Sequence, residues 1–235
     1  MGKTFISLLS GGLDSVVSTY LAAQDAGVGE TLFFDYGQRA LKREREAAGK
    51  ISKAFGASLR VIKLPFLAEV TQTALVMNDK VIPQIKTSKL DDRSETEKSA
   101  QQVWVPNRNG LFLNVAASLA EGLGYTEIVV GFNAEEAATF SDNSANFVNK
   151  AEEFFRLSTL QGIKVHAPTL GMTKTEIVQQ GLALKVPFED LWSCYLGGRK
   201  QCGRCESCLR SLRAFESAGL LEKLAPRYEQ IPKVA

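Results

Sequence analysis

A short apolar run near the start of the chain leads through two glycines directly into a helical pattern. Residues 4–9 predict a buried strand, and the string SGGLDS at Ser10–Ser15 follows it. Apolar residues then recur at helical spacing, so we expect a helix that begins near Asp14 or Ser15 and ends at Gly27. Glycine lets the backbone approach a ligand closely, and the first N–H groups of a helix attract anions. The turn therefore predicts an anion-binding site.

Two familiar phosphate-binding loops do not match this turn. The P-loop signature needs a lysine directly after its last glycine, and the dinucleotide fingerprint needs three spaced glycines. The sequence contains neither pattern. The alternative is an ordinary Gly-Gly turn with a Ser or Asp cap, which the complete six-residue string after an N-terminal strand disfavours.

Length and composition indicate one large domain, or one domain with a small appendage. The chain has 235 residues, of which 45% are hydrophobic and 23% are charged, as in globular proteins. Its formal net charge of +2 gives no argument for a stable nucleic-acid complex. No apolar run approaches the roughly 20 residues that cross a bilayer, and the first residues lack signal-peptide features. We therefore expect a cytoplasmic protein with no membrane association.

Strand and helix patterns alternate along the chain. Further strands are expected at 31–36, 59–64, 127–132 and 163–165, and helices at 41–55, 109–123, around 147–155 and at 173–184. Helix 109–123 is apolar almost all round, which predicts deep burial. The polar stretch 84–102 predicts a mobile surface loop that acts as a lid. Repeated strand–helix units predict an α/β fold, a twisted parallel sheet with helices on both faces.

In such sheets, ligands bind at the carboxyl ends of the strands. Polar residues follow several of the expected strands there: Ser10 to Ser15, then Asp35, Tyr36 and Gln38, then Asn133. These groups suit a nucleotide and a heterocycle. Each of them has a plain alternative, since Asp35 could only cap a turn and Asn133 could only brace a loop.

All four cysteines of the chain lie in one short segment. The spacing of Cys194, Cys202, Cys205 and Cys208 is C-x7-C-x2-C-x2-C. In a reducing compartment this spacing favours a structural zinc site with four thiolate ligands. A redox dithiol or an iron–sulfur cluster is the alternative, and nearby arginines also leave a nucleic-acid-binding zinc ribbon open. We expect a main domain over 1–190 and a small zinc-binding subdomain with a helix over 191–235.

The SGGLDS turn resembles the pyrophosphatase-type loop, or PP-loop, of the N-type ATP enzymes, which include GMP and NAD synthetases and several tRNA-modifying enzymes. That resemblance implies a Rossmann-like fold of the adenine nucleotide α-hydrolase type. It also implies that ATP is cleaved between its α- and β-phosphates while the loop holds the pyrophosphate. The residues implied in ATP binding are Leu8, Leu9, Ser10, Gly11, Gly12, Leu13, Asp14, Ser15, Val16, Val17 and Ser18.

The ordered set of motifs along nearly the whole chain resembles the 7-cyano-7-deazaguanine synthases. The motifs are SGGLDS (10–15), DYGQR (35–39), VPNRN (105–109), GFNAEE (131–136), TKTEI (173–177), WSCY (192–195) and CGRCESC (202–208). The resemblance implies an ATP-dependent ligase that makes a nitrile from 7-carboxy-7-deazaguanine, ammonia and two ATP. This product is a precursor of queuosine and archaeosine in tRNA. The family also implies a homodimer.

Individual roles follow from this resemblance and from the chemistry. Asp14 is expected to bind Mg²⁺ with ATP, and Lys174 to stabilise the transferred α-phosphate. A surface lysine at a helix start is the alternative for Lys174. Asp142 and Gln38 are expected to read the guanine-like edge, and Tyr36, Phe132 or Phe140 to stack on its rings. The complete set expected to bind the substrate is Asp35, Tyr36, Gln38, Arg108, Asn133 and Asp142.

If zinc takes all four cysteines, no thiol is left for catalysis. His166 is the only histidine, so no Cys/His pair is available to hydrolyse glutamine, and nitrogen must arrive as free ammonia or from a partner. Two other functions stay open. Another PP-loop ligase or a tRNA-thiolating enzyme would act through an adenylated intermediate, and the thiolase would need a reactive cysteine. A non-catalytic zinc-dependent binding module would release no pyrophosphate.

Overall fold

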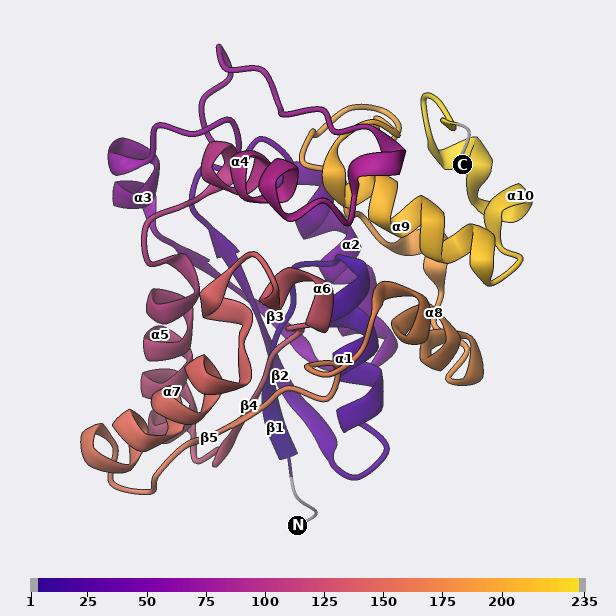
Figure 1. Cartoon of the computed structure of the whole chain (residues 1–235). Coiled ribbons are helices and arrows are strands. Elements are labelled where there is room, and N and C mark those ends of the chain that lie inside the picture. Colours follow the sequence, from indigo (N-terminus) through magenta and orange to yellow (C-terminus); the bar gives the residue numbers. More distant parts are fainter. Residues whose placement is uncertain (1–3, 233–235) are drawn as a thin grey trace.

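The computed structural model describes residues 4–232, and a five-stranded parallel sheet forms its centre (Figure 1). The strands are β1 (Thr4–Leu8), β2 (Gly27–Asp35), β3 (Ser58–Lys63), β4 (Glu127–Val129) and β5 (Lys164–His166). Their order in the sheet is β3-β2-β1-β4-β5, and every neighbouring pair is parallel. The chain thus moves outward from β1 to β3, then crosses back to β4 on the other side of β1.

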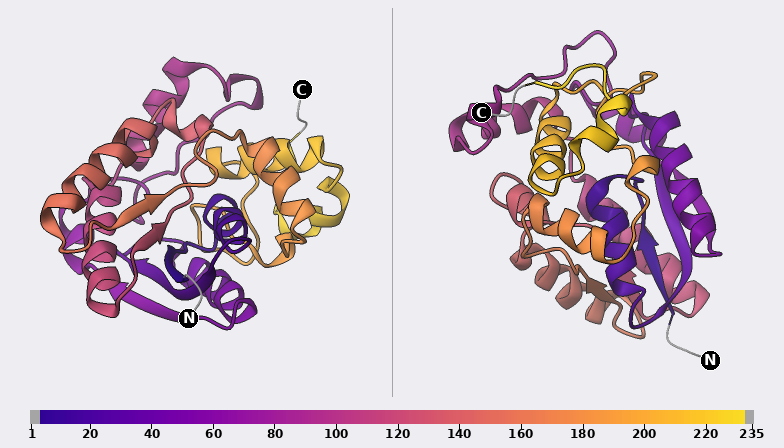
Figure 2. Two further views of the ribbon diagram at one scale, coloured as in Figure 1. Left: turned by 90° about the horizontal axis from the view of Figure 1, so that it is seen from below. Right: turned by 90° about the vertical axis from the view of Figure 1, so that its right-hand side faces the viewer.

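Helices cover both faces of this sheet, which confirms the predicted α/β class (Figures 1 and 2). Helices α1, α2 and α8 pack on one face, and α5 and α7 pack on the other. The helices are α1 (Leu13–Ala22), α2 (Leu41–Ala54), α3 (Pro65–Val70), α4 (Arg93–Val103), α5 (Arg108–Leu123), α6 (Ala134–Ala137), α7 (Ala145–Ser158), α8 (Lys174–Ala183), α9 (Glu206–Ser217) and α10 (Leu221–Leu224). No helix within residues 4–232 has the length and apolar character that a bilayer crossing needs.

The central strand β2 is apolar on both faces over Leu32–Phe34 because helices cover both faces there. In β2, Leu32 and Phe34 enter the core beneath α5 and α7, whereas Phe33 enters the core beneath α1, α2 and α8. Alternate side chains of a strand point to opposite faces, so a fully buried strand needs a continuous apolar run. This is the pattern that the sequence shows at 31–34.

The segment after residue 190 packs onto the same core. Phe215 of α9 and Leu224 of α10 share a buried cluster with Leu13 of α1. The four cysteines form a second cluster with Ala40, Ala47 and Tyr228, so they also contact α2. Figure 1 shows α9 and α10 beside α8 at one side of the molecule. A domain boundary at residue 190 stays a prediction.

The helix expected to end at Gly27 is shorter, and the following strand is longer. Helix α1 ends at Ala22, and β2 already begins at Gly27 rather than at residue 31. The early part of β2 carries two glycines instead of an apolar run, so its sequence does not look like a strand. A Cβ atom on Gly29 would collide with the ring of Tyr125, which explains why glycine stands in this strand.

The prediction of a mobile loop over 84–102 is wrong, because most of this stretch is ordered. It contains a short 3-10 turn (Thr87–Lys89) and helix α4. Asp92 caps α4 by accepting hydrogen bonds from the N–H groups of Ser94 and Glu95 at 3.1 and 3.4 Å. The buried face of α4 consists of Thr96, Ser99, Ala100 and Val103. These small or polar residues carry no hydrophobic periodicity.

Helix α5 is buried on one face only, so the expectation of deep burial is wrong. Leu113, Ala116 and Ala120 are buried, whereas Leu123 is 47% exposed. The helix forms the outer layer on its side of the sheet, where α7 is its helical neighbour (Figure 1). Its apolar outer positions therefore remain partly open to solvent.

Candidate active site

The Ser10–Ser15 loop connects β1 to α1 and is shaped by Gly11. This glycine has φ +81°, and a Cβ atom there would lie 2.7 Å from the carbonyl oxygen of Glu44 in α2. The hydroxyls of Ser10 and Ser15 are 2.9 Å apart, and Ser10 Oγ accepts from the N–H of Gly12 at 3.3 Å. The first intrahelical bond runs from Val16 N to Gly12 O at 3.1 Å. Asp14 N and Ser15 N, in the first turn before Val16, have no hydrogen-bond acceptor within residues 4–232 and can therefore bind an anion.

The end of β4 lies directly against the first turn of α1. A Cβ atom on Gly131 would collide with the backbone of Ser15, so only glycine allows this approach. Ser18 Oγ fixes the contact by donating to the carbonyl of Val130 at 2.6 Å. The sheet reverses its strand order between β1 and β4, and open parallel sheets bind ligands in this position.

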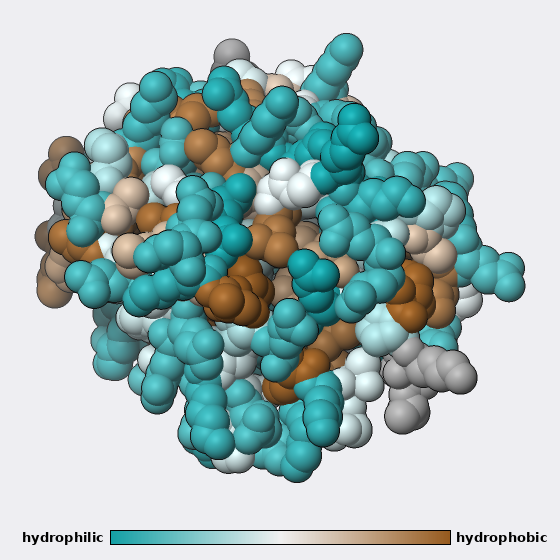
Figure 3. Space-filling model, turned by 90° about the horizontal axis from the view of Figure 1, so that it is seen from above, coloured by the Kyte–Doolittle hydropathy of each residue, from teal (hydrophilic) through white to brown (hydrophobic). Residues whose placement is uncertain are grey.

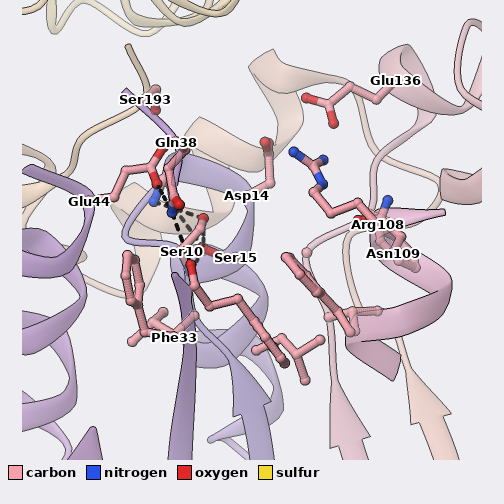
Figure 4. A pocket seen from close by; sticks show the side chains of 18 of the residues that line it. Ser10, Asp14, Ser15, Phe33, Gln38, Glu44, Arg108, Asn109, Glu136 and Ser193 are labelled. Carbon is pink, nitrogen blue, oxygen red and sulfur yellow. Dashed lines mark hydrogen bonds between the residues drawn. The ribbon is translucent and has the colours of Figure 1, made fainter. Parts of the chain in front are cut away.

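A cavity of about 230 Å³ opens at these strand ends, beside a second cavity of about 110 Å³. Figure 4 shows Asp14 between two walls, with Gln38 and Glu44 on one side and Arg108 and Glu136 on the other. Arg108 and Glu136 line both cavities. The two cavities therefore meet beside a cation and a carboxylate.

Lys174 forms a buried ion cluster with two carboxylates. Its Nζ donates to Asp14 Oδ2 and, at 2.9 Å, to Glu136 Oε1, and its side chain is only 5% exposed. Burial raises the pKa of Asp14 to about 6, although Lys174 opposes this shift. Burial alone would lower the pKa of Lys174, but Asp14 and Glu136 raise it. Lys174 therefore stays charged, and the alternative of a surface lysine is wrong.

The start of α8 explains how a lysine is held inside the protein. Thr173 and Glu176 form a capping box, in which Thr173 Oγ accepts from Glu176 N and Glu176 Oε2 accepts from Thr173 N. The N–H of Lys174 donates to Glu135 Oε1 at 2.8 Å. Glu135 also pairs with Arg210 of α9 at 2.8 Å. The TKTE sequence thus fixes the helix start, and the α6 carboxylates fix the lysine.

One oxygen of Asp14 remains without a partner. Asp14 Oδ1 is buried and accepts no hydrogen bond from residues 4–232. A buried carboxylate oxygen beside free helix amides is the donor type that Mg²⁺ prefers when it binds together with phosphates. The residues present therefore fit a Mg²⁺ ion that arrives with ATP.

The wall opposite Asp14 includes a glutamate that sequence reasoning missed. Gln38 Nε2 donates to Glu44 Oε2 at 3.0 Å and to the carbonyl of Phe34 at 2.9 Å. Burial raises the pKa of Glu44 to about 7, against the lowering effects of Gln38 and Arg108. Glu44 lies in the first turn of α2, directly after the polar DYGQR stretch. Its position after DYGQR was the only sign in the sequence that Glu44 could belong to the site. Glu44 was missed because it stands among basic residues and so looks solvent-exposed. Glu136 was missed for a similar reason, as one of two adjacent glutamates in a short helix.

The other predicted residues divide into those that line a cavity and those that do not. Tyr36 and Gln38 line the larger cavity and Asp142 the smaller one, while Arg108 donates to the hydroxyl of Tyr36 at 3.2 Å. Of the predicted nucleotide-binding residues, the larger cavity is lined by Leu8, Leu9, Ser10, Gly12, Leu13, Asp14 and Ser15. Gly11, Val16, Val17 and Ser18 lie behind this surface and support it.

Asp35 and Asn133 line neither cavity. Asp35 Oδ1 accepts from the N–H of Gly37 at 3.3 Å, and Asn133 Oδ1 accepts from the N–H of Glu136 at 3.0 Å. Asn133 therefore caps α6, the helix that presents Glu136 to Lys174. In this structure both residues shape loops, as their plain alternatives predicted.

The four cysteines form a compact buried cluster. The Sγ atoms of Cys194, Cys202, Cys205 and Cys208 all lie within 4.8 Å of one another. A tetrahedral ion with bonds of about 2.3 Å to sulfur needs Sγ–Sγ distances of about 3.8 Å, so the cluster can close on a metal ion. Backbone N–H groups of Leu196 and Cys202 donate to Cys194 Sγ at 3.3 Å, as expected for a sulfur that carries negative charge.

The cysteine segment is bonded to the Ser10–Ser15 loop. Trp192 N donates to the carbonyl of Gly11 at 2.9 Å, and Leu13 N donates to Ser193 Oγ at 3.3 Å. Ser193 immediately precedes Cys194, and Ser207 Oγ donates to the carbonyl of Ser193 at 2.7 Å. The cysteine cluster thus holds one side of the anion-binding loop.

Comparisons with known proteins agree with the motifs. The family model described as queuosine biosynthesis protein QueC matches residues 4–219. A 7-cyano-7-deazaguanine synthase of Methanosarcina mazei is 48% identical over 94% of this chain and 97% of the relative. Proteins of the same name from Pelotomaculum thermopropionicum and Bdellovibrio bacteriovorus are 49% and 45% identical, over 92% and 93% of this chain and 97% and 95% of the relatives. This chain therefore belongs to the queuosine biosynthesis protein QueC family.

Proposed function

We propose that this chain converts 7-carboxy-7-deazaguanine and ammonia to 7-cyano-7-deazaguanine at the expense of two ATP. The main observation behind this proposal is the buried ion cluster of Lys174, Asp14 and Glu136 at the Ser10–Ser15 loop. It brings a permanent positive charge next to free helix amides, and both attract a polyphosphate. The names of the relatives supply the product, 7-cyano-7-deazaguanine, and the cavity supplies room for its ring system.

The first step activates a poor electrophile. A carboxylate oxygen of the substrate attacks the α-phosphorus of ATP, the bond to the β-phosphate oxygen breaks, and an acyl adenylate forms. The amides of the Ser10–Ser15 loop bind the departing pyrophosphate, and Lys174 stabilises negative charge on the α-phosphate. Asp14 holds the Mg²⁺ that accompanies ATP, an ion that neutralises phosphate charge. Arg108, at the junction of the cavities, orients the substrate carboxylate before attack.

The next steps exchange oxygen for nitrogen. Ammonia attacks the acyl carbon, AMP leaves, and one proton is lost, which gives the amide. The amide oxygen then attacks a second ATP at the α-phosphorus and expels pyrophosphate. Loss of AMP with the oxygen, together with two protons from nitrogen, leaves the nitrile. Every chemical step reuses the same phosphate-binding groups, so one site serves both rounds.

Substrate recognition uses the walls of the two cavities. Asp142 accepts hydrogen bonds from the donor edge of the guanine-like ring, and Gln38 and Tyr36 contact the ligand from the β2 side. Burial raises the pKa of Asp142, while the nearby Arg108 favours its charged form. Family resemblance supports a homodimer in solution, which light scattering would measure.

The cysteine cluster binds one structural zinc ion. Four thiolates complete a tetrahedral shell, so zinc there has no open position for substrate and serves to hold the fold. The sequence contains four cysteines in total, and the cluster uses all of them. Ammonia therefore arrives as a free molecule or from a partner protein, since no further thiol is available to release it from glutamine.

Pyrophosphate release and product mass test the proposal. With ATP, ammonia and 7-carboxy-7-deazaguanine, we expect two pyrophosphates for each nitrile detected by mass spectrometry. Asp14→Asn should abolish release with an unchanged circular dichroism spectrum. Asp25→Asn is the matched control, because Asp25 is exposed just beyond the other end of α1. No pyrophosphate from the wild-type protein, or full activity of Asp14→Asn, would contradict the proposal.

A further inference from the structure

Six residues line both cavities and so mark the junction between them: Leu75, Arg108, Glu136, Asn143, Tyr195 and Ser207. Four of the five polar side chains in this set are hydrogen-bonded to other residues. Arg108 donates to the hydroxyl of Tyr36 at 3.2 Å, and Glu136 accepts from Lys174 at 2.9 Å. Asn143 donates to Asp142 at 3.2 Å, and Ser207 donates to the carbonyl of Ser193 at 2.7 Å. Tyr195 is the exception.

The Tyr195 hydroxyl makes no hydrogen bond to any side chain or backbone group of residues 4–232. It is not sealed in the core either, because the buried polar atoms that lack a partner in this range do not include it. The hydroxyl therefore stays accessible, on a side chain that lines the two cavities. A tyrosine hydroxyl loses its proton only near pH 10 or above, so at neutral pH it is a donor. Tyr195 thus offers a free, uncharged donor at the junction.

The chain is held in place on both sides of Tyr195. The indole N–H of Trp192 donates to the carbonyl of Cys194 at 3.1 Å and to the carbonyl of Leu196 at 3.2 Å, and these two residues flank Tyr195. Leu196 N in turn donates to Cys194 Sγ at 3.3 Å. The Tyr195 side chain packs against both the core beneath α5 and α7 and the cysteine cluster. Because the ring is already fixed, its hydroxyl loses little conformational entropy when it binds a ligand.

The charged groups at the junction suit an anionic ligand. The guanidinium of Arg108 points toward Asp14 and carries further N–H donors besides the one that binds Tyr36 (Figure 4). Lys174 offsets the charge of Glu136, so a second carboxylate can approach. A carboxylate accepts several hydrogen bonds, and these are stronger than bonds between neutral groups. The outer face at the carboxyl ends of the strands carries separate apolar patches among polar side chains (Figure 3), so selection of an anion depends on donors inside the cavities.

We propose that the Tyr195 hydroxyl donates a hydrogen bond to the carboxylate of the substrate, beside Arg108, and thereby selects ligands that carry this group. The inference rests on the proposed function for the identity of the ligand. Arg108 supplies positive charge, whereas Tyr195 supplies a directed donor that adds no charge. The substrate carboxylate then lies at the junction, with its ring system on the side of Asp142 and ATP on the side of the Ser10–Ser15 loop.

Binding of two ligands without turnover tests the role of Tyr195 separately from catalysis. The probes are 7-carboxy-7-deazaguanine and 7-deazaguanine, which lacks the carboxylate, measured by isothermal titration calorimetry in the absence of ATP. Tyr195→Phe keeps the ring and removes only the hydroxyl. It should raise the Kd for 7-carboxy-7-deazaguanine roughly 10- to 100-fold, the effect of a lost hydrogen bond to a charged group, and leave the Kd for 7-deazaguanine within about 2-fold. Tyr20→Phe is the matched control, because Tyr20 packs on Phe55 and lines neither cavity.

The results separate this role of Tyr195 from the proposed function. An unchanged Kd of Tyr195→Phe for 7-carboxy-7-deazaguanine, or an equal loss of affinity for both ligands, would overturn the role even if the wild type makes the nitrile. An equal loss is what a merely structural tyrosine predicts. A loss confined to the carboxylate ligand would support the role even if no pyrophosphate is released. A wild-type protein that binds neither ligand, or binds both equally well, would also overturn it.

Discussion

Replacing Glu44 by glutamine should stabilise the protein at alkaline pH and have little effect at acidic pH. Glu44 is held in the cavity wall by Gln38, and burial raises its pKa from 4.5 to about 7. The folded protein therefore keeps the Glu44 proton more tightly than the unfolded chain does. The resulting stabilisation is complete below pH 4.5 and is lost as the pH rises through about 7.

The magnitude follows from the shift in pKa. A shift from 4.5 to about 7 corresponds to a penalty of about 3 kcal/mol once Glu44 is fully ionised. At pH 5 most of this penalty is absent, and about 1 kcal/mol remains. The value at pH 8 is an upper limit, because part of the Glu44 residue reaches the solvent. Glutamine carries no charge and can still accept the hydrogen bond from Gln38.

Urea unfolding at pH 5 and at pH 8 measures this effect. The free energy of unfolding of Glu44→Gln relative to the wild type should increase by about 2 kcal/mol between the two pH values. Glu46→Gln on the same helix is the matched control, since the Glu46 side chain is 47% exposed and pairs with Arg43. A difference between wild type and Glu44→Gln that stays constant with pH, or that reverses, would refute the assignment of a buried, weakly acidic carboxyl.

Three further changes probe other parts of the site. Lys174→Met should lower kcat for pyrophosphate release roughly 10²- to 10³-fold, because a preorganised charge is lost, and an unchanged kcat would show that Lys174 does not act on the phosphate. Gly131→Ala should lower the free energy of unfolding in urea by about 1–3 kcal/mol, since the new Cβ displaces the backbone of Ser15. As a control, a Cβ added at Gly122 meets no atom within 4 Å, so Gly122→Ala should stabilise α5 by about 0.5–1 kcal/mol. The wild type is expected to carry one zinc ion per chain, and Cys208→Ser should lower both this zinc content, measured by elemental mass spectrometry, and the Tm. Full zinc content in this variant would count against the four-thiolate site.

Local sequence signals predicted the parts of the site that depend on neighbouring residues. The strand–glycine–helix turn, the helix expected from residue 173 and the cysteine spacing each arise within a few residues, so their geometry is encoded in short strings. A role for Lys174 at the α-phosphate was expected from the family motif, but its burial was not, and the carboxylates of Asp14 and Glu136 explain that burial physically.

The missing parts depend on contacts between distant segments. Glu44 in α2 and Glu136 in the short helix α6 look like surface glutamates, and only the tertiary arrangement turns them toward the cavity. Helix α4 was hidden because its buried face uses threonine, serine and alanine instead of large apolar side chains.

The hydrogen bonds of Trp192 and Ser193 to the Ser10–Ser15 loop also bear on protein synthesis. Leu13 and Ser193 are separated by 180 positions, so the nascent chain exposes the phosphate-binding loop long before its bonding partners leave the ribosome. A chain that stops before Trp192 contains the whole sheet but lacks both of these bonds and every cysteine. The shape of the Ser10–Ser15 loop thereby depends on Trp192 and Ser193, and products terminated before them lack a finished loop.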